Sequence, residues 1–243
     1  MCVVKHNNPC GFAVGKDPVK LFKQAFAGDP LSAFGGIVGL NRGVTAAVAR
    51  AITSAGFLEC VVAPAFDSGA LEVLRKKKNL RIVRMDPKPS GDPWDFKKIS
   101  GGLLLQEPDR KDVGVKALKT VTRKKPTTAQ TSDMLLGFKL LRFVKSNAIV
   151  IVKNSQAIGI GMGLPSRVDS VLTALRKAGP RAKGAVLASD GFFRKPDSIQ
   201  VAAKKGIKAF IQPGGSIQDA EVIRAADRAK LSMVFAGVRH FTH

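Results

Sequence analysis

The chain has 243 residues, of which 45% are hydrophobic and 24% charged, so it can bury a sizeable core and is not disordered as a whole. No apolar run approaches the roughly 20 residues of a membrane span, and the N-terminus lacks the apolar core of a signal peptide. Forty basic and 18 acidic residues give a net charge of +22, which favours polyanionic partners: nucleic acid, phosphorylated substrates or acidic folates. The three cysteines cannot form a disulfide framework, so we expect a reducing, cytoplasmic compartment.

Short runs rich in β-branched residues alternate with helical patterns along the chain. This alternation predicts an α/β fold with layered sheets and helices and mostly parallel strands, and the continuous apolar runs suit sheets covered on both faces. The expected strands are 2–4, 36–40, 58–63, 80–83, 148–152, 185–188, 209–211 and 233–236. The expected helices are 18–26, 44–55, 69–77, 198–205, 219–230 and one that runs from a capping box at 127–130 to about 144.

The two halves of the sequence resemble each other. Residues 55–83 are similar to 205–235, and the opening VVKHNNPCGFAVG is similar to IVIVKNSQAIGIG. Each pair predicts the same succession of strands, turns and helices, so we expect two related lobes, 1–120 and 121–243. Residues 86–100, with Pro87, Pro89, Gly91 and Pro93, read as an irregular loop.

Several motifs are too weak to define a chemistry. The stretch GFAVGKD (11–17) is too short for a phosphate loop and ends in Asp17 where Ser or Thr is needed. The glycines of GIGMG (159–163) mark either a glycine-rich site or a strand on which another backbone packs closely. A zinc site is not expected, because there is no His-x-Glu and no Pro-Cys-x-x-Cys pair.

Five polar clusters follow predicted elements. At 5–11, a lysine beside a histidine could keep the imidazole neutral and ready to accept a proton, although ordinary surface is the commoner explanation. At 145–147 and 166–167, an asparagine and an arginine could hold an oxyanion and a phosphate or carboxylate, or could be a cap and a surface charge. The clusters at 189–193 and 212–216 favour plain turns, and 239–243 favours a loose basic tail.

Nine motifs resemble one family in the same order. They are KHNNPCG, DPLSAFGG, FLECVVAP, ISGGLLLQEPD, FVKSNAIVIVKN, GIGMGLPSRVDS, LASDGFF, IQPGGSIQDAEVI and VFAGVRHFTH. They are similar to the transformylase domain of bifunctional purine biosynthesis proteins, a 5-aminoimidazole-4-carboxamide ribonucleotide (AICAR) formyltransferase. The resemblance implies two cytidine-deaminase-like lobes without zinc, and a homodimer with active sites at its interface. It implies formyl transfer from 10-formyltetrahydrofolate to the 5-amino group of AICAR.

The resemblance also assigns roles to individual residues. Lys5 would stabilise the transition state, His6 would accept the amine proton, and Asn147 would position the carboxamide and help hold the tetrahedral oxyanion. The residues implied to contact AICAR are Gly35, Glu59, Arg167, Phe192 and Arg239. The residues implied to line the folate pocket are Val168, Asp197, Ser216 and Ile217. A neutral histidine and a cationic lysine suit this reaction, because the amine is a poor nucleophile and its attack needs proton removal and charge stabilisation.

The chain departs from the family pattern in four places. Leu164-Pro165 replace a Gln followed by Met or Gln, and the run Gly191-Phe192-Phe193-Arg194-Lys195 replaces Ala-Phe-Phe-Pro-Phe, with charges that could reach the glutamate tail of folate. The upstream Arg-Tyr-Gly-Glu-Asn-Pro-like stretch and the inosinate cyclohydrolase half have no counterpart. We therefore consider a stand-alone short form, a split enzyme with a separate cyclohydrolase partner, and a fragment.

The charge leaves an alternative of another class open. Between Arg75 and Lys125 there are 16 basic and 6 acidic residues. With the changed positions 164–165 and 194–195, this surplus allows a catalytically eroded relative that binds RNA or a ribonucleoprotein. A basic surface that steers anionic substrates, or is merely solvated, would explain the same surplus.

Overall fold

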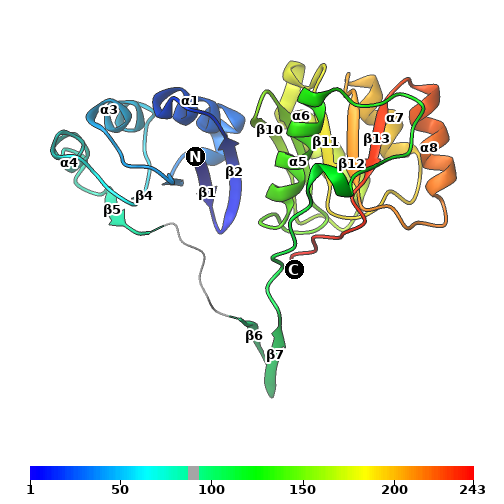
Figure 1. Cartoon of the computed structure of the whole chain (residues 1–243). Coiled ribbons are helices and arrows are strands. Elements are labelled where there is room, and N and C mark those ends of the chain that lie inside the picture. Colours follow the sequence, from blue (N-terminus) through cyan, green and yellow to red (C-terminus); the bar gives the residue numbers. More distant parts are fainter. Residues whose placement is uncertain (87–92) are drawn as a thin grey trace.

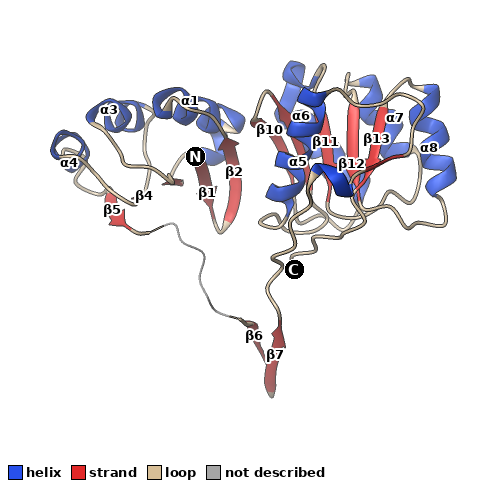
Figure 2. Cartoon of the chain, viewed as in Figure 1, coloured by secondary structure: helices blue, strands red, loops and turns tan. Residues whose placement is uncertain are grey.

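The structure is a computed structural model that describes residues 1–86 and 93–243. In these residues two sheets and eight α-helices form a mixed α/β protein (Figures 1 and 2). The strands are β1 (Cys2–Lys5), β2 (Asn8–Ala13), β3 (Ile37–Gly39), β4 (Cys60–Ala63), β5 (Arg81–Arg84), β6 (Asp95–Ile99), β7 (Gly102–Gln106), β8 (Lys119–Thr120), β9 (Ile149–Lys153), β10 (Gln156–Gly161), β11 (Val186–Ser189), β12 (Ala209–Gln212) and β13 (Ser232–Phe235). The helices are α1 (Pro18–Gly28), α2 (Pro30–Ala33), α3 (Ala46–Ser54), α4 (Ser68–Arg75), α5 (Thr128–Leu141), α6 (Arg167–Ala178), α7 (Asp197–Lys204) and α8 (Asp219–Arg228).

One sheet of eleven strands runs through both halves, in the order β5-β4-β3-β1-β2-β10-β9-β11-β12-β13-β8. The pairs β3–β4, β4–β5, β11–β12 and β12–β13 are parallel, and the other pairs of this sheet are antiparallel. The expectation of mostly parallel strands is therefore wrong. Each half contains a tight hairpin, β1–β2 or β9–β10, and a two-residue hairpin loop forces antiparallel pairing.

The order of elements repeats about the centre of the sheet. Outward from the β2–β10 pair, β2-β1-β3-β4-β5 has the same order as β10-β9-β11-β12-β13. Both hairpin loops have two residues with positive φ, namely 51° and 60° at His6 and Asn7 and 52° and 61° at Asn154 and Ser155. This is the turn conformation that matches the twist of paired strands. The internal similarity of the sequence thus corresponds to a repeated topology.

Helices cover the two halves of the sheet unequally. In the second half, α6, α7 and α8 pack on one face and α5 on the other, so Ile149 to Val152 of β9 are all fully buried. In the first half, α1, α3 and α4 pack on a single face, where Val3, Val38 and Val61 are fully buried. On the opposite face Ile37 and Val83 are 39% and 40% exposed, so the expected two-sided cover holds only for the second half.

The halves are joined by few but specific contacts. Strands β2 and β10 pair over two residues only, Ala13 with Gln156 and Phe12 with Ala157. At the C-terminal end of α1, the Nζ atom of Lys177 lies 2.9 Å from an Oδ atom of the buried Asp29. The guanidinium of Arg181 donates to the carbonyl oxygens of residues 27 and 28 at 2.6 and 3.1 Å. The end of α1 is thereby anchored to α6 and the turn that follows it.

All strands and helices expected from the sequence are present, within a few residues at each end. Asp17 caps α1, and Thr127 and Gln130 form the expected capping box at the start of α5. The sequence analysis did not predict β2, β7, β8, β10, α2 and α6. The expectation of an irregular loop at 86–100 is wrong from Asp95 onward, where β6 pairs with β7, and its residues 87–92 lie outside the described residues.

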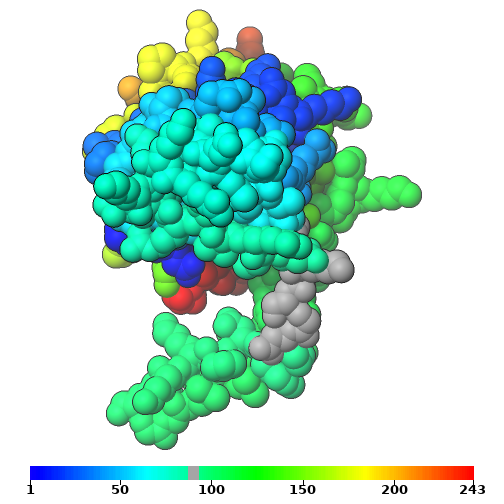
Figure 3. Space-filling model, turned by 90° about the vertical axis from the view of Figure 1, so that its left-hand side faces the viewer, coloured from blue at the N-terminus to red at the C-terminus, as the bar shows by residue number. Residues whose placement is uncertain are grey.

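Strands β6 and β7 form an arm that stands clear of the body of the molecule (Figures 1 and 3). All ten of their residues are exposed. The cross-strand pair Phe96 and Leu105 lies on the same face as Leu103, and these side chains are 62%, 56% and 56% exposed. A two-stranded hairpin is only marginally stable alone in water, and this one leaves its apolar side chains exposed.

Candidate functional site

A pocket of about 470 Å³ opens at the N-terminal end of α6. Its walls come from the segment before β9, the start of α6, the loop between β11 and α7, the start of α7, and the C-terminal segment. Its lining includes six of the residues expected to contact ligands: Asn147, Arg167, Val168, Phe192, Asp197 and Arg239. The structure therefore gathers into one cavity residues that are up to 92 positions apart in the sequence.

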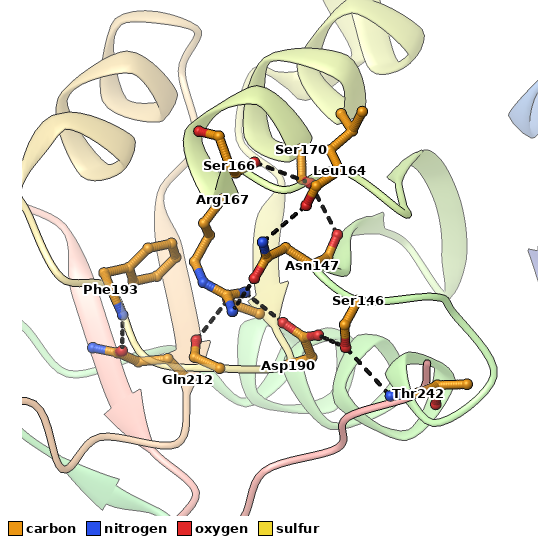
Figure 4. A network of polar contacts seen from close by, with 12 residues as sticks. Ser146, Asn147, Leu164, Ser166, Arg167, Ser170, Asp190, Phe193, Gln212 and Thr242 are labelled. Carbon is orange, nitrogen blue, oxygen red and sulfur yellow. Dashed lines mark hydrogen bonds and ion pairs between the residues drawn. The ribbon is translucent and has the colours of Figure 1, made fainter.

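Arg167, the first residue of α6, is the centre of a polar network beside this pocket (Figure 4). Its Nη1 donates to the Oγ of Ser189 at 2.8 Å and to Oδ1 of Asp190, and its Nη2 donates to Oδ1 of Asn147 at 2.7 Å. Asp190 is completely buried, and its other carboxylate oxygen accepts from Ser146 at 2.6 Å. A buried carboxylate needs such partners, and Arg167 supplies the opposite charge.

Asn147 is held from both ends of its amide (Figure 4). Its Nδ2 donates to the carbonyl oxygens of Leu164 and Pro165 at 2.8 and 2.9 Å, while its Oδ1 accepts from Arg167. The backbone oxygen of Asn147 accepts from the buried Ser170 at 2.9 Å. The asparagine therefore connects the Leu164-Pro165 turn to the start of α6.

Glycines on β10 allow α6 to lie close enough to form the pocket. A Cβ atom on Gly161 would lie 2.0 Å from the carbonyl oxygen of Ser170, and one on Gly159 would lie 2.2 Å from that of Ala174. In the first half, a Cβ atom on Gly11 of β2 would lie 1.8 Å from the carbonyl oxygen of Ala25 of α1. Of the two explanations for the glycines at 159–163, close packing of another backbone is thus confirmed for Gly159 and Gly161.

The pocket is strongly cationic at its rim. The guanidinium of Arg239 lies 4.8 Å from the ring centre of Phe192, and that of Arg194 lies 6.0 Å from it. Within the described part of the chain, no carboxylate pairs with these two arginines or with Lys195. Positive charge without a counter-ion next to the half-buried ring of Phe192 is suited to a planar, anionic ligand.

A second cluster lies in the first half, at the end of β1. Lys5 Nζ donates to the carbonyl oxygen of Phe34 at 2.6 Å and would lie 3.8 Å from a Cβ atom on Gly35. His6 is exposed in the hairpin turn. Asn8 donates to the His6 carbonyl at 3.0 Å, and its own Oδ1 is buried without a partner among the described residues. An unsatisfied acceptor beside a lysine and a histidine marks a place where a ligand N–H could bind.

The remaining predicted site residues are distributed as follows. Glu59 lies beside the Lys5 cluster, because its backbone N–H donates to the oxygen of Gly36 at 3.0 Å, and its carboxylate pairs with Arg81. Ser216 and Ile217 precede α8 and are outside the lining of the pocket, with Ile217 99% exposed. None of the residues of the Lys5 cluster lines the pocket at α6, so one chain presents two separate groups of predicted site residues.

The C-terminal segment is packed, which corrects the expectation of a loose basic tail. His240 is 1% exposed, and its Nδ1 lies 2.6 Å from an Oδ atom of Asp109. The centre of its ring lies 4.7 Å from that of Phe138 of α5, with the two rings tilted by 57°. The backbone of residue 242 donates to Ser146 at 3.3 Å. These contacts fix the segment so that Arg239 and Phe241 reach the pocket.

Sequence reasoning undervalued the cluster at 189–193. It favoured a plain turn there, whereas Ser189 and Asp190 bind Arg167, and a Cβ atom on Gly191 would lie 2.5 Å from Nη2 of Arg167. The available signal was a Ser-Asp pair directly after an apolar run that ends at a sheet edge. Ser146 and Ser170 gave no signal of their own.

No group of three or more metal-ligating side chains occurs among the described residues. Burial raises the pKa of the Cys10 thiol to about 11, with the negative charge of Asp29 contributing, so this cysteine is not a ready nucleophile. No helix in residues 1–86 or 93–243 is long and apolar enough to cross a membrane.

The fold and pocket define a mixed α/β protein with a cationic cavity suited to an anionic, planar ligand. The sequence profile described as "AICARFT/IMPCHase bienzyme" matches residues 1–177. The chain is 46% identical over 243 residues to the bifunctional purine biosynthesis protein PurH of Desulfitobacterium hafniense, covering 99% of this chain and 47% of that protein. It is 50% identical over 248 residues to PurH of Persephonella marina, with the same coverage. The chain therefore belongs to the AICARFT/IMPCHase bienzyme family.

Two further facts concern the length of the match and the similarity to solved structures. The chain spans about half the length of the curated relatives that it matches. Among solved structures, RibD of Acinetobacter baumannii is 20% identical, covers 44% of this chain and 34% of its own, and has a TM-score of 0.31, which is too low to support an argument about the fold.

Proposed function

We propose that the chain transfers the formyl group of 10-formyltetrahydrofolate to the 5-amino group of AICAR, in purine biosynthesis. The observation that carries this proposal is the pocket at α6, where Arg167 and Asn147 meet a cationic rim in a member of the AICARFT/IMPCHase family. AICAR is a planar heterocycle with a phosphate, and folates are carboxylates. Both substrates therefore have the chemistry that this pocket suits.

The reaction needs a proton acceptor and stabilisation of charge at the formyl carbon. We assign proton removal from the amine to His6 and stabilisation of the transition state to Lys5, with Gly35 and Glu59 beside them. No metal takes part in this assignment.

In the pocket, Phe192 and Arg239 would bind the nucleotide together with Arg167 and Asn147. Val168 and Asp197, which also line this pocket, would contact the folate, and Ser216 and Ile217 would do so from outside it. Arg194 and Lys195 would then meet the carboxylates of the folate tail.

We further propose a homodimer in which each active site combines the Lys5 cluster of one protomer with the Arg167 pocket of its partner. Two observations support it: the two groups of site residues are separate within one chain, and the β6–β7 arm exposes apolar side chains that a second copy would cover. The repeated strand order supports two related lobes, and we propose that they are cytidine-deaminase-like and comprise residues 1–120 and 121–243. We assign the protein to the cytoplasm, with a cyclohydrolase as the partner that consumes its product.

The direct test is an assay of the purified 243-residue chain with AICAR and 10-formyltetrahydrofolate, which follows the release of tetrahydrofolate. The proposal predicts turnover that requires both substrates. The matched control is the Lys5→Ala variant, which keeps the pocket at α6 and should bind AICAR but lose turnover. Absence of turnover and of AICAR binding in the folded, dimeric parent protein would refute the proposal.

A further inference from the structure

The C-terminal segment presents its side chains alternately to the pocket and to the interior. Arg239 and Phe241 are exposed and line the pocket, whereas His240 between them is 1% exposed. This alternation is typical of an extended chain, in which neighbouring side chains point to opposite sides. A contact that holds the His240 ring therefore also holds Arg239, the cation that lies 4.8 Å from the ring centre of Phe192.

His240 is held by a hydrogen bond and by packing, and the two can be separated. Its Nδ1 lies 2.6 Å from Oδ2 of Asp109. An ionised carboxylate only accepts, so Nδ1 carries the hydrogen and donates. Because the imidazole is buried while Asp109 is 33% exposed, removal of the carboxylate would leave a buried donor without this partner. The contact with Phe138, at 4.7 Å between ring centres, does not involve a hydrogen bond.

Asp109 belongs to the segment that leads from the β6–β7 arm to α5. It follows the last residue of β7 by three positions, and Pro108, whose φ is fixed by its ring, directly precedes it. Three positions further on, Asp112 accepts from Lys139 at 3.2 Å and from Arg142 at 2.8 Å, at the C-terminal end of α5. In Figure 1 the C-terminus lies beside this segment, close to the base of the arm.

We infer that Asp109 and His240 are a pair of positioning residues that links the β6–β7 arm to the pocket at α6. The pair holds the C-terminal segment so that Arg239 faces the anionic ligand of the pocket. An arm that is fixed keeps Asp109 beside His240, and an arm that moves draws Asp109 away and releases Arg239. The identity of the ligand as AICAR rests on the proposed function.

Two substitutions of His240 separate the hydrogen bond from the packing. Asparagine keeps the donor, because its Nδ2 is bonded to Cγ as Nδ1 of histidine is, but it loses the ring. Phenylalanine keeps the ring and has no donor. In calorimetric titrations, His240→Asn should bind AICAR within about threefold of the parent, and His240→Phe about tenfold more weakly. The reverse order, or equal affinities of the two folded variants, would overturn the inference.

A double-mutant cycle tests the link to the arm. Two glycines inserted between Gln106 and Glu107 leave the arm and the Asp109–His240 pair in place but let one move without the other. The insertion should weaken AICAR binding about five- to tenfold in the parent, but less than about twofold when Asp109→Ala is already present. No loss in the parent, or equal losses in both backgrounds, would overturn the link.

The matched control for Asp109→Ala is Glu107→Gln. It removes a carboxylate from an exposed residue of the same segment, two positions before Asp109. If the Asp109 carboxylate acts by its hydrogen bond, Asp109→Ala should weaken AICAR binding about tenfold, and Glu107→Gln should change it less than about twofold. Equal effects of the two variants would show that only net charge matters, and would overturn the inference.

A readout without substrate separates this inference from the proposed function. The chain has only three histidines, so the ring signals of ¹⁵N-histidine-labelled protein can be assigned, that of His240 by its loss in His240→Phe. The parent and Glu107→Gln should show an Nδ1–H signal for His240 that is protected from exchange with water, and Asp109→Ala should lack it. An unprotected Nδ1–H in the parent would contradict the inference. A protected signal in a parent that fails to bind AICAR would support the pair and refute only the proposed function.

Discussion

Replacement of Gly161 by alanine tests how closely α6 packs on β10. The new Cβ atom would lie 2.0 Å from the carbonyl oxygen of Ser170 and 2.8 Å from its carbonyl carbon, both backbone atoms of α6. An ordinary contact begins at 3.4 Å, so the helix would have to withdraw by about 1.4 Å. Backbone in the middle of a sheet and a helix cannot yield as a flexible side chain can.

The expected cost is that of overpacking, about 1–3 kcal/mol. For a chain of this size each kcal/mol lowers the melting temperature by roughly 2–4 °C, so Gly161→Ala should melt about 2–12 °C below the parent protein. Because Arg167 begins the same helix, its guanidinium should move away from Asn147 and Asp190. AICAR binding should therefore weaken about tenfold or more.

Thermal unfolding followed by circular dichroism, with calorimetric titration of AICAR, measures both effects. Gly114→Ala is the matched control, because a Cβ atom there meets nothing within 4 Å and the residue has φ −93°, which alanine adopts readily. The control should melt within about 1 °C of the parent. Equal melting temperatures and affinities for the two variants would refute the close packing of α6 on β10.

Three further predictions concern chemistry, pH and charge. His6→Ala should lower formyl transfer about a hundredfold or more, and Lys5→Ala at least as much; unchanged turnover in a steady-state assay would remove the role of that residue. Burial alone would raise the pKa of Asp29, but hydrogen bonds from Ser32 and Lys177 outweigh burial and hold the pKa below its usual value of about 3.9. The ionised Asp29 therefore contributes fully to the free energy of unfolding above that value, and this contribution is lost as the pH falls below it. Asp29→Asn should reduce the loss of stability at acid pH, and an unchanged dependence of stability on pH in that range would contradict this. Replacement of the three lysines at 76–78 by glutamate should leave AICAR affinity nearly unchanged. If the basic surface steers substrates, the same variant should bind AICAR more slowly at low salt. If the parent protein instead binds RNA tightly and the variant loses this salt-dependent binding, the result would favour an RNA-binding role.

The sequence predicted the elements of the fold better than their pairing. Helices α1 and α5 were predicted at their N-terminal residues because Asp17 and the Thr127–Gln130 capping box mark those starts by local hydrogen bonds. Strands β2 and β10 were missed because Pro9, Gly11, Gly159 and Gly161 interrupt the apolar pattern. Those glycines are required by helices that pack on the strands, which is a tertiary cause that no local pattern reveals.

In the candidate site too, local sequence signals were predicted and tertiary contacts were not. Motif resemblance identified Arg167 and Asn147, and the structure brings them into contact at 2.7 Å. The buried Asp190 that pairs with Arg167 received little weight, because a Ser-Asp pair at a strand end is usually a turn. Its role depends on the chain returning to the same sheet edge 23 positions after Arg167. Burial of this kind can be read only from the folded chain.

The proposal that two chains build each active site can be tested by complementation. Lys5→Ala and Arg167→Ala each damage a different group of site residues, so either homodimer should be inactive. Subunits of the two variants, mixed by co-expression, should form about half heterodimers, each with one site free of both substitutions, so activity should recover to about a quarter of the parent's. Recovery to that level would support composite sites, and a mixture as inactive as either variant, with heterodimers present, would contradict them.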